Sequence, residues 1–241
     1  MFKRLMDGCI AHHKTTTFAM VVATAALALL AALPSVWPES FPRLHGVKVD
    51  TDPENMLPAT EHVRVFNHEM KQEFALYDML VVGVVNDRAP DYVFNPDTLR
   101  DIHALTEYAK TLRGEAVGKP EDPQAGVIGI DIIAPSTVDN VEQGGLGAVS
   151  FSWLMPEPPE TAEAARAVRD KAMKLPFMKG TLVSEGGQAI ALYLPLSDKH
   201  LSYKVAEKLR AKIAEFASGD SYHITGLPIA VLDSIHLLSE L

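Results

Sequence analysis

The stretch TTTFAMVVATAALALLAAL, residues 15–33, decides how this chain is organised because it contains no charged residue. Continued to Trp37, the segment reaches about 23 residues, close to the roughly 20 that a helix needs to cross about 30 Å of hydrocarbon. A helix can cross because its backbone groups hydrogen-bond to one another without water. Trp37 suits the lipid–water boundary, and Pro34 and Pro38 stop the helix there. We therefore expect residues 15–37 to form a transmembrane helix.

Two other interpretations compete with a membrane anchor. A buried core helix would be shorter and polar on one face, which this run is not. A cleaved signal peptide is the closer rival, because Lys3, Arg4 and Lys14 form a basic segment before the run. However, the apolar run exceeds the usual 7–15 residues, and its clean Ala-x-Ala motif, residues 26–28, lies in mid-run. A retained anchor is the better interpretation.

Charge sets the orientation that we expect. The basic side of a membrane helix stays in the cytoplasm, so residues 1–14 are predicted to be cytoplasmic and those from about 38 periplasmic, beyond the cell inner membrane. The whole chain has a net charge of −9. Residues 1–37 have a net charge of +2, so the residues after them have a net charge of −11. This acidic balance argues against a nucleic-acid surface. The single Cys9 precedes the helix, so packing alone must hold the exported part together.

Hydrophobic periodicity predicts alternating strands and helices after the anchor. The clearest helix start is Asn95, a cap residue followed by Pro96 in the first turn, with Leu99, Ile102, Leu105 and Leu112 marking an inner face. A second helix, 60–74, places Val63, Phe66, Met70 and Phe74 on one side. The other expected helices are 160–174 and 198–216, and the expected strands are 44–50, 79–85, 127–133, 148–154, 181–184, 189–194 and 222–225. This order fits two small βαβ-type sandwiches, around 79–133 and 148–225.

Four phrases in this order carry a resemblance to a known family: VDTDPENML at 49–57, FNPDTL at 94–99, LPF at 175–177 with GTLVS at 180–184, and ITGLP at 224–228. Behind a single membrane helix, their order resembles the N-terminal portion of a resistance–nodulation–division (RND) exporter. The similarity is greatest to the branch called mycobacterial-membrane-protein-large (MMPL), which includes exporters of hopanoids and other lipids.

The resemblance implies an α+β fold: one transmembrane helix followed by ferredoxin-like βαββαβ porter subdomains. Residues 38–228 would form the periplasmic porter region, with a possible subdomain break near 135–160, and 229–241 a truncated tail before the expected second membrane helix. Such a region lines a route for a hydrophobic or lipid-like substrate, and its partners are the lipid bilayer and the remainder of the transporter. No intramembrane acid is present that would mark a proton path, so no proton-coupling residue is carried over.

A different class of function remains open. The chain is alternatively a single-pass, membrane-anchored sensor or solute-binding module. That hypothesis predicts a signalling element inside the cell, and the 14 residues before the helix are too few for a signalling domain.

Enzyme and metal motifs are weak throughout the sequence. Asp50-x-Asp52-x-Glu54, with Glu61 further on, mimics a calcium loop, but Asn55 replaces the required Gly and Pro53 stiffens the loop. The histidines lack partners at ligand spacing, and no Gly-x-Ser-x-Gly elbow occurs. We expect no enzyme activity, no cofactor and no metal.

Five aromatic side chains are the candidate binding residues. They would line a passage for the hydrophobic substrate, or else form an ordinary sandwich core, which is the commoner role of such side chains. They are Phe74, Tyr77, Phe151, Trp153 and Phe177.

Overall fold

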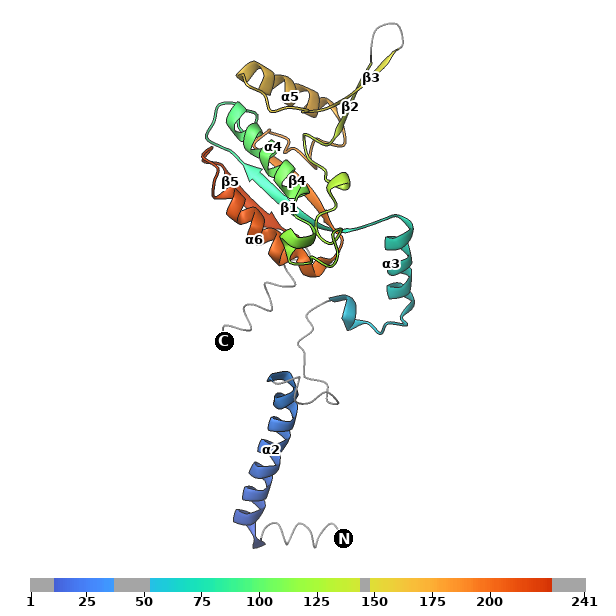
Figure 1. The fold of residues 1–241 in the computed structure, drawn as a ribbon, viewed down its shortest axis with the longest axis vertical. Helices are drawn as coiled ribbons and strands as arrows, with labels where there is room; N and C mark the ends of the chain where they lie inside the picture. Colours follow the sequence, from blue (N-terminus) through green and yellow to red (C-terminus); the bar gives the residue numbers. More distant parts are fainter. Residues whose placement is uncertain (1–10, 37–52, 144–147, 227–241) are drawn as a thin grey trace. The chain divides into compact units, whose positions relative to one another are not determined.

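A computed structural model describes residues 11–36, 53–143 and 148–226 (Figure 1). The chain divides into two compact units, Met1–Asp50 and Thr51–Leu241. The expected strand at 44–50 and the tail at 229–241 lie outside the described residues, as does Trp37.

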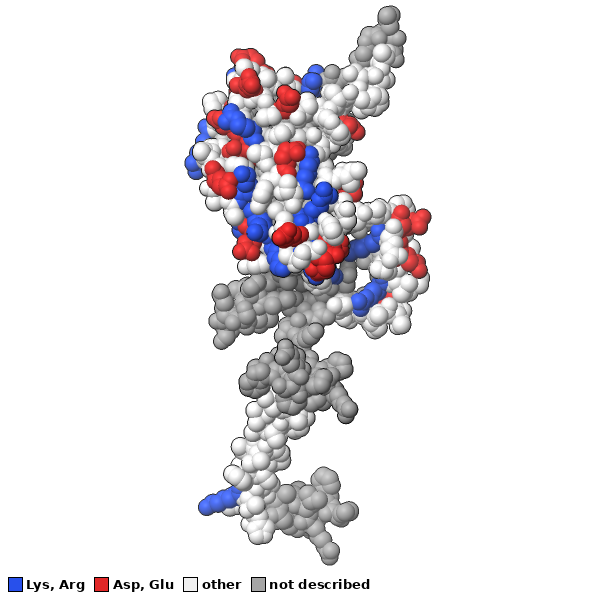
Figure 2. Space-filling model, viewed as in Figure 1, with Lys and Arg blue, Asp and Glu red and all other residues white. Residues whose placement is uncertain are grey.

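The first unit consists of helix α2 (His13–Val36). Residues His13–Leu33 are long and apolar enough to cross a membrane, and none of this span is buried against protein. Its surface carries almost only uncharged side chains (Figure 2). The Thr24 hydroxyl donates to the Met20 carbonyl at 2.8 Å, which satisfies this polar group within the helix. The prediction of an N-terminal helix of membrane-spanning length is confirmed.

The second unit is mixed α/β and is built on a three-stranded antiparallel sheet. Strand β1 (Asp78–Val85) lies at its centre, pairing along its whole length with β4 (Ala189–Leu196) and over Val81–Val85 with β5 (Ser221–Thr225). Alternate residues of β1 are fully buried while their neighbours are half-buried, so one face of the sheet carries the core. The buried residues of β1 are Leu80, Val82 and Val84.

Residues 127–133 lie along the outer edge of β4 but do not form the regular strand that the sequence predicts. Val127 bridges Leu196 and Ile133 bridges Tyr193, both antiparallel. Six steps along this segment therefore face three steps along β4. The excess residues form a 3-10 turn, η4 (Gly129–Asp131), which leaves Ile130 90% exposed.

Two helices cover the buried face of the sheet, α4 (Pro96–Lys110) and α6 (Ser202–Ile213), with the turn η6 (Lys199–Leu201) before α6 (Figure 1). The Asn95 Oδ1 accepts from the Thr98 N–H at 2.9 Å, which confirms the predicted cap. All four predicted inner residues are buried: Leu99, Ile102, Leu105 and Leu112.

Helix α3 (His62–Glu73) forms where expected, but its apolar side meets no core, because none of its residues is buried. Val63, Phe66 and Phe74 are each more than half exposed. The polar contacts of α3 run to both sides of the helix. The Arg64 guanidinium donates to the Leu57 carbonyl at 2.7 Å, beside the turn η2 (Pro53–Met56), and the Lys71 ammonium lies 3.4 Å from the Asp78 carboxylate at the start of β1.

The chain between α4 and β4 holds a short turn, η3 (Gly114–Val117), a two-stranded ribbon, β2 (Asp139–Gln143) with β3 (Val149–Trp153), and helix α5 (Ala162–Lys174). Of the hairpin expected at 181–194, only the second strand forms, as β4. The expected first strand, 181–184, makes a single antiparallel bridge to β4, between Val183 and Ile190. One continuous cluster of buried residues runs from Leu80 to Leu209. A subdomain break near 135–160 stays a prediction.

Substituting Gly126 tests how closely the chain that leads into residues 127–133 lies against the segment after α4. A Cβ at Gly126 would lie 2.3 Å from the Leu112 carbonyl oxygen and 2.7 Å from the Arg113 Cα, both backbone atoms, and φ is +130°. We expect Gly126→Ala to lower the free energy of unfolding by roughly 3 kcal/mol or more. The matched control is Gly180→Ala, where φ is +85° but no atom lies within 4 Å, so only backbone strain of about 1 kcal/mol is expected. Equal losses in chemical denaturation would contradict this placement.

Candidate functional site

None of the five candidate aromatics belongs to the buried core. Their exposed fractions range from 37% for Tyr77 to 73% for Phe151. The interpretation of these side chains as an ordinary sandwich core is therefore wrong. Their role in lining a substrate passage stays a prediction.

The structure brings together only two of the five. Phe151 and Trp153 alternate with serines on β3, so both side chains lie on the same face of the ribbon. Phe74 and Tyr77 lie between α3 and β1, and Phe177 lies in the turn that follows α5.

The ribbon formed by β2 and β3 is amphipathic. Val141 lies directly opposite Phe151, and Val149 continues the same face, where all of these side chains are about half exposed or more. On the other face, Asn140 is buried and pairs with Ser152. In Figure 1 the ribbon extends past the end of α5. An exposed apolar strip of this kind marks a surface that contacts lipid, an apolar ligand or another protein.

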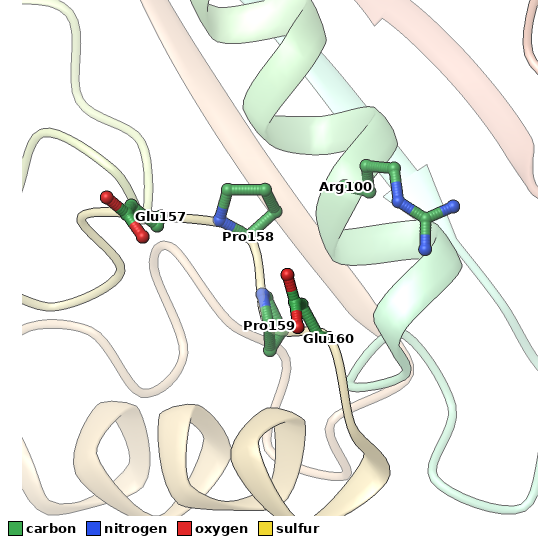
Figure 3. Close-up of a pocket in the computed structure, with 5 residues that line it drawn as sticks. All are labelled: Arg100, Glu157, Pro158, Pro159 and Glu160. Atoms are coloured by element: carbon green, nitrogen blue, oxygen red, sulfur yellow. The ribbon is translucent and has the colours of Figure 1, made fainter.

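A surface pocket of 420 Å³ lies beside the N-terminal half of α4 (Figure 3). Arg100 projects from α4, and the other lining residues come from the segment before α5: Glu157, Pro158, Pro159 and Glu160. The Arg100 guanidinium already pairs with the Asp97 carboxylate at 2.9 Å. The lining is charged rather than mostly apolar, so this pocket does not have the character of a lipid site.

A cluster of polar side chains occupies the end of the sheet where β1 ends and β5 begins. Asn86, just after β1, donates from Nδ2 to the Asp220 Oδ1 at 2.6 Å. Three buried atoms nearby complete no hydrogen bond within the described part of the chain: Ser218 Oγ, Asp220 Oδ2 and Tyr222 Oη. No local pattern in the sequence indicates this cluster, because its members are spread over more than a hundred positions.

Burial perturbs two ionisable groups in this cluster. It raises the pKa of the Asp101 carboxyl, the Ser218 hydroxyl opposes that shift, and the negative charge of Asp220 adds to it. Burial also raises the pKa of the Tyr222 phenol to about 12. Both shifts favour the protonated, neutral form of the side chain.

No group of three or more His, Cys, Asp or Glu side chains that could hold a metal ion occurs among the described residues. Much of the calcium-like motif, from Asp50, falls outside them. On the visible face of the second unit, acidic and basic side chains are interspersed (Figure 2).

Comparisons with known proteins gave no relative, since no protein-family model and no curated protein matches the chain. The membrane-length helix, the topology of the sheet and the exposed apolar ribbon are the features on which a function can be argued.

Trimming the ribbon separates its role from that of the core. Phe151 is 73% exposed, whereas Leu154, three residues later, is 3% exposed. We expect Phe151→Ala to change the free energy of unfolding by less than about 0.5 kcal/mol, because it removes no core contact. Leu154→Ala should cost roughly 2–5 kcal/mol through lost burial and the cavity left behind. Chemical denaturation of both variants measures the difference, and a comparable loss for Phe151→Ala would place that ring in a packed interface.

Proposed function

We propose that this chain is the N-terminal part of a membrane transporter similar to RND exporters of the MMPL branch, and that it handles lipids or other hydrophobic compounds. The observation that carries the proposal is the order of elements from β1 onward, in a chain that begins with a helix of membrane-spanning length and continues through η2 and α3. The resemblance of the four sequence phrases supports the same family.

The topology favours a ferredoxin-like subdomain. Along the chain the elements run β1, α4, the edge segment 127–133, β4, α6 and β5, which is a βαββαβ order. Across the sheet the order is edge segment, β4, β1, β5, with antiparallel neighbours throughout. Both helices lie over one face. The ribbon and α5 are then an insertion between the second and third strands of this subdomain.

The proposed location is the cell inner membrane, with α2 crossing it and the second unit in the periplasm. Basic residues before α2 favour a cytoplasmic N-terminus. Within the span His13–Leu33, Lys14 near the start is the only charged residue, so this helix offers no carboxylate for a proton path. Energy coupling belongs, in this proposal, to further membrane helices of the transporter.

The exposed apolar strip supports a hydrophobic substrate. Val141, Val149, Phe151 and Trp153 present a continuous surface that water solvates poorly. Flat aromatic rings offer acyl chains a large apolar contact area. We propose that this strip meets the substrate or the rest of the transporter.

Photo-crosslinking tests the hydrophobic-substrate proposal on the full chain in native membranes. A lipid carrying a photoreactive acyl chain should label the ribbon, and Phe151→Ser combined with Trp153→Ser should reduce the labelling of residues 139–153 several-fold. Ile130→Ser is the matched control, since it removes another exposed apolar side chain, on the turn η4 and outside the ribbon.

Two results would contradict the proposal. Labelling of the ribbon that the double variant leaves unchanged would remove the strip as a lipid contact. A gene whose downstream sequence encodes no further membrane spans with intramembrane acids would favour the single-pass sensor or solute-binding module instead.

A further inference from the structure

The apolar side of α3 meets no core within the described part of the chain. None of the helix residues is buried, although their spacing is that of a helix that packs against other elements. Exposed apolar side chains continue on both sides of the helix, at Met56 and at Leu76. An exposed surface of this kind marks an interaction site. The residues that share the apolar side of α3 are Val63, Phe66, Met70 and Phe74.

A defined turn connects α3 to the sheet. The Leu76 N–H donates to the Lys71 carbonyl at 2.9 Å, and Ala75 has a φ of 47°, the left-handed conformation that commonly ends a helix. The Lys71 ammonium also lies 3.4 Å from the carboxylate of Asp78, the first residue of β1. The C-terminal end of α3 is therefore tied to the start of β1.

The chain leaves the sheet at this same end. β5 pairs antiparallel with β1, and its last residue, Thr225, lies opposite Val81. At Gly226 the backbone passes so close to β1 that a Cβ would lie 2.6 Å from the Met79 carbonyl oxygen. Because neighbouring strands are about 4.8 Å apart, the chain after Gly226 begins next to the connection that joins α3 to β1.

The segment 227–241, which lies outside the described residues, has the sequence pattern of an amphipathic helix. Pro228 suits a first turn, and Asp233, His236 and Glu240 follow at spacings of three and four, which place them on one side of a helix. A helix from Pro228 onward would be about 21 Å long, against about 18 Å for α3. The apolar residues on the other side are Ala230, Val231, Ile235, Leu237, Leu238 and Leu241.

Two other occupants fit the apolar side of α3 less well. A helix that lies on a lipid surface is usually rich in Lys and Arg, whereas residues 53–77 hold four glutamates against Arg64 and Lys71. Both basic side chains already contact neighbouring groups, at Leu57 and Asp78. A second copy of the chain would have to compete with a segment that is covalently held at the same end of the sheet, at a roughly millimolar effective concentration.

We propose that residues 228–241 form a helix that packs antiparallel along the apolar side of α3. α3 runs towards the sheet and the segment after β5 runs away from it, so the adjacent antiparallel strands set the two helices side by side. This packing covers Phe66 and Phe74 with apolar side chains of the same chain. The two connections at this end of the sheet then stabilise each other. This inference does not depend on the proposed transport function.

Site-specific photo-crosslinking in the full chain, held in lipid nanodiscs, tests the pairing. A benzophenone amino acid in place of Phe66 should crosslink to residues 227–241, as mapped by peptide mass spectrometry. Val65, an exposed residue on another side of α3, is the matched control position and should give no such crosslink. An equal mixture of isotope-labelled and unlabelled chains tells a crosslink within one chain from a crosslink between two copies.

Three outcomes of this experiment would overturn the proposal. Crosslinks from position 66 that reach only lipid would assign the apolar side of α3 to the bilayer. Crosslinks that join labelled to unlabelled chains would assign it to a second copy. Crosslinks that reach neither of these nor the segment 227–241 would also exclude the pairing.

A second measurement needs no crosslink. In a Cys9→Ser background, Phe66→Cys should react several-fold more slowly with a water-soluble maleimide than Val65→Cys, because the segment after β5 covers position 66. Adding Ile235→Asp and Leu238→Asp should abolish this difference, since charged side chains on the apolar side of that segment cannot be buried without a partner.

The matched control changes only the polar side of the segment. Asp233→Asn combined with Glu240→Gln should leave the slow reaction at position 66 unchanged. Equal reaction rates at positions 65 and 66 would contradict the pairing. A slow reaction at position 66 that the two aspartates do not relieve would contradict it as well, because something other than the segment 227–241 would then cover α3.

Discussion

The pairing of strand β1 on both of its edges is the constraint on which the second unit depends. β4 and β5 both lie more than a hundred positions after β1 in the chain, and each hydrogen-bonds to a different edge of β1. The strand also contributes to the hydrophobic core, since Leu80, Val82 and Val84 are fully buried. They lie on the face of the sheet that α4 and α6 cover. Burial of each such side chain contributes roughly 1.5–3 kcal/mol, so the sheet order and the core are stabilised by the same residues.

The exposed aromatic side chains that could contact a hydrophobic substrate belong to elements outside this sheet. The exposed aromatics lie on the ribbon, around α3 and in the turn after α5, and none of them belongs to the central cluster. Stability and surface recognition are therefore separable by mutation. The polar cluster is the exception, because Tyr222 belongs to strand β5 of the sheet and Asp101 to helix α4, which covers the sheet.

Local signals in the sequence were enough to predict the elements whose causes are local. The run MLVVGVV predicts β1, and Asn95 with Pro96 predicts the start of α4, because strand burial and helix capping depend on residues that are close in the chain. The apolar run before Trp37 predicts α2 for the same reason.

Features set by distant contacts were predicted less well. The segment 127–133 has the composition of a strand, but its mismatch with β4 forces η4 into the middle. β2, with the sequence DNVEQ, has little strand character of its own and is held by pairing with β3. Hydrophobic spacing alone also does not reveal what an apolar side contacts. The apolar side of α3 and the five candidate aromatics are therefore exposed where a packed core is the commoner expectation. The carboxyl–hydroxyl cluster has no sequence signature, since only folding brings Asp101 beside Ser218.

A designed disulfide across the outer edge of β4 tests the βαββαβ arrangement most directly. Ile133 and Tyr193 exchange both backbone hydrogen bonds, at 3.0 and 2.9 Å, so their Cα atoms are about 5.5 Å apart, within the range a disulfide spans. In a Cys9→Ser background, Ile133→Cys with Tyr193→Cys should form a disulfide readily under mild oxidation, and Ile130→Cys with Tyr193→Cys should not. Equal oxidation of the two pairs, or failure of the first, would contradict the placement of residues 127–133 beside β4.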